Sequence, residues 1–183
     1  MVKKIIITGG LGYIGTELCK IYSGVSWHHK IIVIDNRFIS ERVNQIRNWN
    51  MEFIHGDILN KELVNKYFKD ADVVHHLAGI TDVPRTKSES NSEKDKKIIL
   101  VGEKGTNNIL EAISNECKII FPSTHVVYEG IDKVKNDIKE NEETKPVLSY
   151  SSSKAANEKQ LKKSGKNYVI LRLGSVYGYS SDT

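Results

Sequence analysis

The sequence is poor in the residues that build disulfide scaffolds and metal sites. It has only two cysteines, Cys19 and Cys117, and neither belongs to a C-x-x-C pair. Two isolated thiols exclude a disulfide framework or a zinc finger and are typical of buried cysteines in a reducing compartment. The adjacent His75 and His76 have no third ligand at a useful spacing, so we expect them to end a strand and not to bind a metal.

Proline and long apolar runs are also scarce. The chain has three prolines in 183 residues, and no apolar stretch is long enough to cross a bilayer or to form the hydrophobic region of a signal peptide. With 39% hydrophobic and 27% charged residues, the composition is that of an ordinary globular protein. We therefore expect no membrane partner and take the cytoplasm as the default location.

Charge of one sign is not in large excess. The 27 basic and 23 acidic residues give a formal net charge of +4, with lysine-rich patches at 94–97 and 159–166. Such patches are typical of solvated helix faces, so we expect no nucleic-acid partner. A mild attraction for anionic ligands is compatible with this charge.

Short β-branched runs alternate with longer segments of helical period. The predicted strands are Lys4–Thr8, Ile31–Asp35, Met51–His55, Ala71–His76, Lys118–Pro122 and Tyr168–Leu173, and the predicted helices are Tyr13–Tyr22, Ser40–Arg47, Lys61–Phe68, Ser92–Ser114 and Ser149–Lys163. This alternation predicts an α/β fold with a doubly wound parallel sheet of about six strands and helices on both faces. Two long connections, Thr81–Asn91 and Tyr128–Leu148, follow strands and so fall on the side where a ligand would bind.

A glycine-rich turn follows the first predicted strand directly and opens the first predicted helix. Its glycines are Gly9, Gly12 and Gly15, and Tyr13 and Ile14 lie between the last two. Small residues let the backbone approach a pyrophosphate, whose charge is favoured at a helix N-terminus, and the third glycine lets the helix pack closely on the strand. The turn therefore predicts the dinucleotide site of a Rossmann fold.

Acidic residues follow the second and third predicted strands. Asp35, which precedes Asn36, lies where a carboxylate accepts hydrogen bonds from the adenosine ribose and repels a 2′-phosphate, so NAD is favoured over NADP. The nearby Arg37 keeps this preference a hypothesis. Asp57 and Ile58 are placed to accept from an adenine amino group and to pack against its ring. For Asp57 an alternative stays open, that it caps the helix that follows.

The last predicted helix carries Tyr150 and Lys154, which are four residues apart and therefore on one face. A nearby ammonium favours the phenolate, so we expect Lys154 to lower the pKa of Tyr150 towards the range of a general base. Thr124, at the end of the fifth predicted strand, could hydrogen-bond the substrate oxygen from which Tyr150 would take a proton. A Y-x-x-x-K pair alone is a weak signal.

Taken in order, these motifs resemble those of the extended short-chain dehydrogenase/reductase family, in particular its NAD-dependent sugar-nucleotide epimerases and dehydratases. The motifs are T-G-G-x-G-Y-I-G, Asp35, Gly56-Asp57-Ile58, Leu77-Ala78-Gly79, Ser123-Thr124, Tyr150-x-x-x-Lys154 and the run from Leu171 to Gly178. The resemblance implies NAD as the cofactor, lined in part by Leu77, Ala78 and Gly79. It also implies that Tyr150 is the acid/base, that Lys154 tunes it and holds the nicotinamide ribose, and that Thr124 assists the proton transfer.

The resemblance further implies a nucleotide-sugar substrate, hydride transfer from a sugar carbon to NAD, and a keto intermediate. In the 4,6-dehydratases an Asp-Glu pair follows the catalytic threonine, and the related decarboxylases keep the glutamate, but this chain has His125 and Val126 there. Epimerisation or simple oxidoreduction is therefore favoured. His125 either supplies a polar group at the site or faces solvent. Gly102 and Ser175 also depart from the pattern, because relatives often carry Asn at both places.

Alternatives are a dehydratase or reductase of the same family and a non-catalytic NAD-binding module, and the intact Thr-Tyr-Lys set favours an enzyme. Family members continue well beyond the sixth strand into a smaller substrate-binding lobe, whereas this chain stops at Thr183. We expect residues 1–183 to form the NAD-binding domain without that lobe, as a fragment or as a naturally short relative. The resemblance also implies a homodimer in which the fourth and fifth helices form a four-helix bundle with their counterparts.

Overall fold

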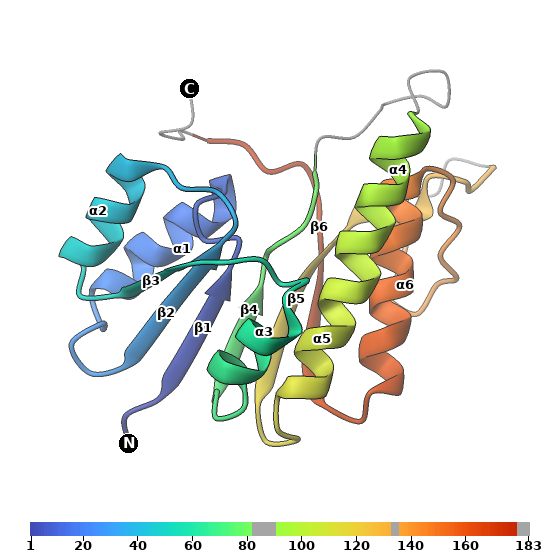
Figure 1. Ribbon diagram of the computed structural model, residues 1–183. Helices are drawn as coiled ribbons and strands as arrows, with labels where there is room; N and C mark the ends of the chain where they lie inside the picture. The colour runs from blue at the N-terminus through green and yellow to red at the C-terminus, as the bar shows by residue number, and fades with distance from the viewer. Residues whose placement is uncertain (82–90, 133–135, 179–183) are drawn as a thin grey trace.

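The computed structural model describes residues 1–81, 91–132 and 136–178. Within these residues a single sheet of six parallel strands has the order β3-β2-β1-β4-β5-β6 (Figure 1). The strands are β1 (Lys4–Thr8), β2 (Lys30–Asp35), β3 (Glu52–His55), β4 (Val73–His76), β5 (Lys118–Thr124) and β6 (Asn167–Leu173). This order is that of the doubly wound dinucleotide-binding sheet, so the predicted Rossmann fold is confirmed.

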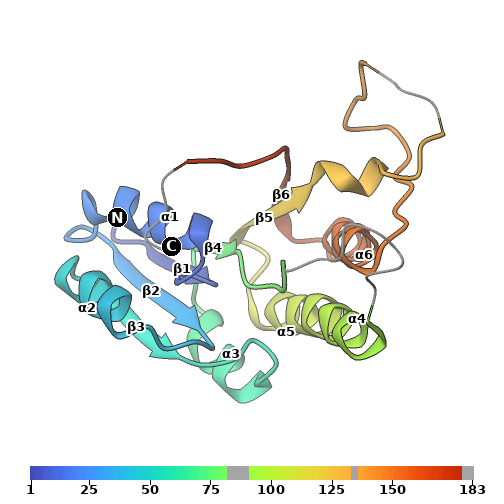
Figure 2. The ribbon, with the colours of Figure 1, turned by 90° about the horizontal axis from the view of Figure 1, so that it is seen from above.

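Helices cover both faces of the sheet (Figure 2). The helices are α1 (Tyr13–Ser23), α2 (Ser40–Asn48), α3 (Lys61–Phe68), α4 (Ser92–Ile99), α5 (Gly105–Ala112) and α6 (Ser149–Lys163). Alternate residues of β1 point to opposite faces: Ile5 and Ile7 belong to the hydrophobic cluster under α1 and α2, and Ile6 belongs to the cluster under α3, α5 and α6. The alternation therefore builds two cores, one on each side of the sheet.

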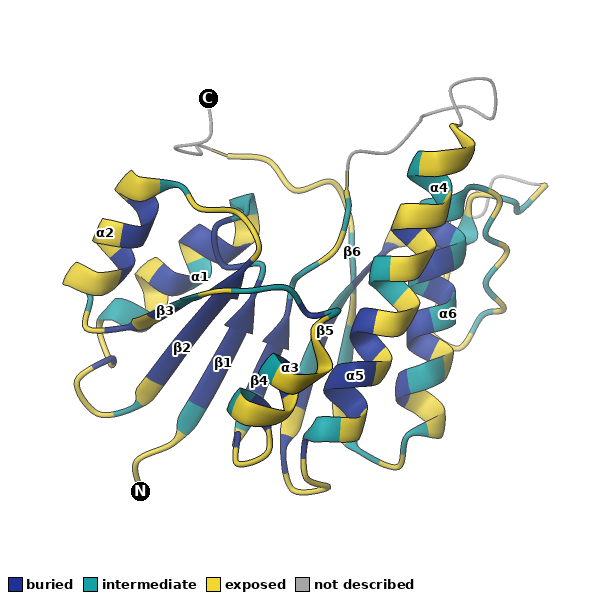
Figure 3. Cartoon of the chain, viewed as in Figure 1, coloured by how far each residue is buried: buried dark blue, intermediate teal, exposed yellow. Residues whose placement is uncertain are grey.

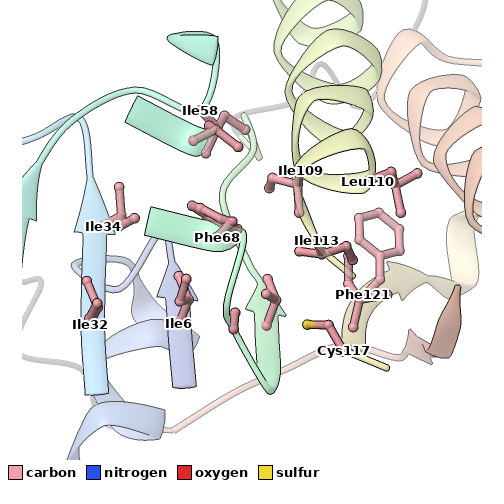
Figure 4. Packing of buried hydrophobic residues seen from close by; sticks show 14 of the residues in the cluster. Ile6, Ile32, Ile34, Ile58, Phe68, Ile109, Leu110, Ile113, Cys117 and Phe121 are labelled. Carbon is pink, nitrogen blue, oxygen red and sulfur yellow. The ribbon is translucent and has the colours of Figure 1, made fainter. Parts of the chain in front are cut away.

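The larger core lies between the middle of the sheet and the helices α3 and α5. Ile6 and Ile34 from the strands pack with Phe68 and Ile109 from these helices (Figure 4). Figure 3 shows the centre of the sheet buried, whereas β6 at its edge is only partly covered. The sheet is thus buried most completely at β1, β2 and β4.

The predicted long helix Ser92–Ser114 is interrupted, which corrects the sequence-based prediction. A π-helical turn, Leu100–Lys104, separates α4 from α5. In this wider turn the carbonyl of Gly102 accepts from Asn157 Nδ2 and that of Glu103 accepts from Gln160 Nε2, both at 3.0 Å. A Cβ on Gly102 would lie 2.1 Å from Ser153 Oγ. The π turn and the glycine together let α6 pack closely against this helix.

Strand β5 continues two residues beyond its predicted end at Pro122. Pairing with β6 extends to Thr124, opposite Leu173, whereas pairing with β4 stops at Ile120. The missing N–H of Pro122 therefore falls beyond the end of β4, and the carbonyl of Pro122 accepts from a helix side chain, Lys154 Nζ, at 2.7 Å. The extension places Thr124 at the carboxyl edge of the sheet.

The two predicted long connections are partly described. Of Thr81–Asn91, residues 82–90 lie outside the described residues. In Tyr128–Leu148, backbone bonds join Lys145 N to Val127 O and Gly130 N to Lys145 O, each at 2.8 Å, so the two ends of this connection pack on each other. Among the residues that the structure describes, no helix has the length and apolarity needed to span a membrane.

A buried chain of polar side chains ties β1, β4 and α5 together. The imidazole of His76 bonds Thr8 Oγ1 through Nδ1 at 3.0 Å and Thr106 Oγ1 through Nε2 at 2.9 Å. Thr8 Oγ1 also accepts from the N–H of Ala78 at 3.0 Å. Burial, with a smaller repulsion from Lys154, lowers the pKa of His76 to about 3. A neutral imidazole therefore forms this link over most of the pH range.

This link predicts a specific sensitivity to acid. The pKa of His76 is about 3 in the folded chain and 6.5 when unperturbed, so below pH 6.5 the unfolded chain takes up a proton that the folded chain does not. The free energy of unfolding should fall with decreasing pH, and this residue contributes up to about 1.4 kcal/mol per pH unit within that interval. Urea unfolding across the interval measures the slope.

A His76→Gln variant, whose amide can still bond both threonines, should lose that contribution, whereas replacing the exposed His28 by Gln should leave the slope unchanged. Equal slopes for the parent and the His76→Gln variant would contradict the assignment.

Candidate functional site

A cavity of about 890 Å³ opens at the carboxyl ends of the strands, where the strand order reverses between β1 and β4. Its volume is in the range of cofactor and ligand sites. It brings together every site residue predicted from the sequence, namely Gly9, Gly12, Tyr13, Ile14, Gly15, Asp35, Asn36, Asp57, Ile58, Leu77, Ala78, Gly79, Thr124, Tyr150 and Lys154. The glycine turn and the Thr-Tyr-Lys set, far apart in sequence, therefore line one hollow.

The glycine turn packs backbone against backbone. Gly9 has a φ of +67°, and a Cβ there would lie 2.8 Å from the backbone nitrogen of Ala78. A Cβ on Gly15 would lie 2.3 Å from the carbonyl oxygen of Gly9. Gly12, the N-cap of α1, has no side chain to cap the helix. The first N–H groups of α1 thus remain available to an anionic ligand at the cavity.

Asp35 is a buried carboxylate that holds the glycine turn in place. Its Oδ2 accepts from the N–H of Leu11 at 3.0 Å, and its Oδ1 accepts from the N–H of Arg37 at 2.9 Å and from Arg37 Nε at 3.3 Å. From α2, the buried Arg42 donates to the carbonyl of Leu11. Arg42 was not predicted from the sequence, because an arginine in a polar helix is expected to face solvent.

Asp57 lies beside the end of β2. Its Oδ2 accepts from Asn36 Nδ2 at 3.2 Å, and its Oδ1 accepts from the N–H of Leu59 at 2.8 Å. The alternative that Asp57 caps the next helix is wrong, because the N-cap of α3 is Asn60, whose side chain accepts from the N–H of Leu63 at 3.1 Å. Asp57 is therefore held at the cavity by the turn after β3.

The three residues predicted for the chemistry come from β5 and α6. Thr124 Oγ1 accepts from the N–H of Val126 at 3.3 Å, a contact that leaves its O–H available as a donor. The ammonium of Lys154 donates to Pro122 O at 2.7 Å, and it lies 4.5 Å from the centre of the Phe121 ring and 5.9 Å from that of Tyr150. Lys154 thus joins the helix to the strand end that carries Thr124.

The expected lowering of the Tyr150 pKa is not found in the protein alone. Burial raises the pKa of Tyr150. Burial also lowers the pKa of Lys154, to about 8. The ammonium is directed at the carbonyl of Pro122, so desolvation of the phenol is the larger effect.

A buried ion pair fixes α6 further along its length. Glu158, four residues after Lys154, accepts from Ser123 Oγ at 2.7 Å and from Arg172 Nε and Nη2 at 2.9 and 2.6 Å. Arg172 also bonds the hydroxyl of Tyr128. Glu158 was not predicted from the sequence: its spacing from Lys154 places both on one helix face, but a glutamate in a polar helix is expected to face solvent.

Lining residues from α4 and the π turn were also missed. Lys97, Leu100 and Val101 border the cavity. Their spacing of three and four residues is that of one helix face, a signal present in the sequence.

The remaining polar candidates lie elsewhere. His75 Nε2 bonds the hydroxyl of Tyr22 at 2.8 Å. His125 is exposed, bonds the carbonyl of Leu173 at 3.2 Å through Nδ1, and is not among the cavity-lining residues, which favours the interpretation that it faces solvent. Ser175 is exposed in the segment after β6. Within residues 1–81, 91–132 and 136–178, no three His, Cys, Asp or Glu side chains gather to hold a metal ion.

Known proteins resemble the chain in sequence and in structure. It is 33% identical over 205 residues to the CDP-paratose 2-epimerase of Salmonella typhi, and this alignment covers 96% of this chain and 58% of that protein. It is 31% identical over 198 residues to the dTDP-D-glucose 4,6-dehydratase of Dictyostelium discoideum, covering 97% of this chain and 44% of that protein. The chain thus spans about half the length of the curated relatives that it matches.

The structure is similar to that of UDP-glucuronic acid 4-epimerase from Bacillus cereus in complex with NAD, with a TM-score of 0.77 and 29% identity over 96% of this chain and 57% of that one. A sequence model described as the NAD dependent epimerase/dehydratase family matches residues 5–183. That match includes the glycine turn, Asp35, Thr124, Tyr150 and Lys154. The chain therefore belongs to the NAD dependent epimerase/dehydratase family.

Proposed function

We propose that the chain is the NAD-binding part of an epimerase that acts on a nucleotide sugar through hydride transfer and a keto intermediate. The observation that carries the proposal is that Thr124, Tyr150 and Lys154 line the same cavity as the glycine turn. A module that only held NAD would not need a tyrosine hydroxyl beside it. The names of the relatives, which act on CDP-, dTDP- and UDP-linked sugars, support the substrate class.

The cavity has the features that NAD requires. The glycine turn at the N-terminus of α1 suits the pyrophosphate, and the buried Asp35 at the end of β2 suits the hydroxyls of the adenosine ribose. Asp57 and Ile58 suit the adenine, and both line the cavity. We expect NAD to be preferred over NADP, because the guanidinium of Arg37 already pairs with Asp35 and the carboxylate repels a 2′-phosphate.

Bound NAD⁺ would supply the hydride acceptor, and the chain's own residues would move the proton. Tyr150, as phenolate, would take the proton of a sugar hydroxyl as the carbon that bears this hydroxyl is oxidised. Thr124 would donate a hydrogen bond to the same oxygen. Because burial raises the pKa of Tyr150, the phenolate needs a cation near it, and the Lys154 ammonium, 5.9 Å from the centre of the Tyr150 ring, would have to turn from the carbonyl of Pro122 to provide it. Reduction of the keto sugar would need it to present its other face to the cofactor, and Tyr150 would return the proton to the sugar oxygen.

Epimerisation is favoured over dehydration by the residues after Thr124. Removal of water needs an acid and a base beside the keto sugar, and His125 and Val126 replace the Asp-Glu pair of the dehydratases. His125 cannot take the role of that acid from its observed position, because it is exposed and bonded to the end of β6.

Replacing Tyr150 by Phe tests the catalytic assignment. The variant should bind NAD as the parent does but lose turnover of a nucleotide sugar by at least about 100-fold, because it has no group to exchange the proton. Conversion across a panel of nucleotide sugars, with calorimetry for NAD, measures both quantities. Tyr168→Phe, on the exposed edge strand, is the matched control and should keep full activity. Persistent turnover in the Tyr150→Phe variant would refute the assignment.

Adding a methyl group to the glycine turn tests the cofactor site. In Gly15→Ala the new Cβ meets the carbonyl oxygen of Gly9 at 2.3 Å, so the turn must open. We expect NAD affinity to fall by at least about tenfold, or about 1.4 kcal/mol. Gly24→Ala is the control, since its nearest atom is 3.8 Å away and its φ is −66°. Equal loss in both variants would show that the effect is not local to the site.

We also propose a homodimer in which α4–α5 and α6 pair with their counterparts. Ile99, at the end of α4, is 39% exposed and does not line the cavity, which is consistent with an apolar contact between subunits. Sedimentation should show a dimer, and Ile99→Glu should dissociate it. Glu in place of Ile21, which is 74% exposed on α1, should not. A parent chain that sediments as a monomer would contradict the proposal.

A further inference from the structure

The first turn of α6 carries Tyr150 but receives no side-chain cap from its own N-cap residue. That residue is Leu148, whose side chain has no hydrogen-bond acceptor. The first bond within the helix runs from the N–H of Ser152 to the carbonyl of Leu148 at 2.9 Å. Helix N-termini without a capping acceptor are less stable, so the position of Tyr150 needs support from elsewhere.

Glu129 supplies this support from the segment after β5. Its Oε1 accepts from the N–H groups of Val147 and Leu148, at 2.7 Å each, and from the hydroxyl of Ser151. The oxygen of Ser151 accepts in turn from the N–H of Leu148 at 3.2 Å. One carboxylate oxygen therefore joins the two residues before α6 to the third residue of the helix.

The carboxylate form of Glu129 is favoured at this place. Burial alone would raise the pKa of Glu129, but the hydrogen bonds from Ser151, Leu148 and Val147 outweigh burial and lower it. A negative charge is also stabilised at the positive end of a helix. Hydrogen bonds to an ionised acceptor are stronger than neutral ones, so the contact is well suited to fix the first turn.

Glu129 is itself fixed relative to Thr124. A 3-10 helix, His125–Tyr128, begins directly after Thr124, and Glu129 is its C-cap residue. The neighbouring Gly130 bonds the carbonyl of Lys145 at 2.8 Å. Thr124 and the first turn of α6 are thus linked through five consecutive residues and one carboxylate.

We propose that Glu129 is a positioning residue that holds the first turn of α6, and with it the phenol of Tyr150, in a fixed position relative to Thr124. The inference rests on the proposed function for its catalytic consequence. The contacts of Lys154 with Pro122 and of Glu158 with Ser123 hold the second and third turns of α6, so loss of Glu129 should loosen the first turn without unfolding the helix.

Hydrogen exchange tests the structural step and needs no substrate. In Glu129→Ala the amide of Ser152 should exchange about fivefold faster, as expected for the loss of a helix cap, while amides in the last turn of α6 keep their protection. Glu129→Gln retains an acceptor oxygen and should restore most of the protection. Glu143→Ala removes an exposed carboxylate of the same connection and should change nothing. Unchanged exchange at Ser152 in Glu129→Ala would overturn the proposal.

Kinetics test the positioning step. Glu129→Ala should lower kcat by about tenfold while the KM for the nucleotide sugar and the NAD affinity stay within about twofold, because a displaced phenol harms proton transfer and not binding. In a Tyr150→Phe background the same change should lower residual turnover no further, since the two residues act through one group. A drop in kcat of equal size in both backgrounds would refute action through Tyr150. Absence of turnover in the unaltered chain would count against the proposed function, and the exchange result would still decide the role of Glu129 in the first turn.

Discussion

The close approach of the glycine turn to the end of β4 sets the geometry of the whole site. Gly9 lies so near the backbone of Ala78, and Gly15 so near that of Gly9, that no side chain fits at either place. This contact brings the N-terminus of α1 to the point where the strand order reverses. Asp35 accepts from the N–H of Leu11, and Arg42 donates to the carbonyl of the same residue. Side chains from β2 and α2 therefore hold the turn in place. Dinucleotide binding depends on this arrangement of backbone and buried charge.

The other half of the site depends on how α6 is held against β5. The helix is joined to the strand end by Lys154 and by Glu158, and the π turn at Gly102 lets it pack closely on its neighbouring helix. These contacts use charged groups in partly buried positions, where a lost partner is costly. The same lysine that would hold the nicotinamide ribose thus also has a structural role. This dual use explains why burial, and not the lysine charge, governs the pKa of Tyr150 in the protein alone.

The sequence was sufficient to predict the fold and to place the glycine turn, Asp35, Thr124 and Tyr150 at one site, although the lining residues Lys97, Leu100 and Val101 were missed. Strand and helix periods are local, and parallel strands meet at one edge, so Asp35, Thr124 and Tyr150 could be placed together from their positions after strands and on a helix. The charged residues that hold the glycine turn and α6 in place were not predicted. Arg42, Glu129 and Glu158 contact groups distant in sequence, and a charged residue in a helix or loop is expected to be solvated unless the fold is known. The π turn was not predicted because it is stabilised by side chains from α6, Asn157 and Gln160, and no local sequence pattern indicates it.

The most direct test of the account is a calorimetric titration of the chain with NAD⁺ and with NADP⁺ under the same conditions. The buried carboxylate of Asp35, with Arg37 already paired to it, predicts one NAD⁺ bound per chain and an affinity at least about tenfold above that for NADP⁺, equivalent to about 1.4 kcal/mol. No binding of NAD⁺, or tighter binding of NADP⁺, would contradict the assignment of the cavity as an NAD site in which Asp35 selects against the 2′-phosphate.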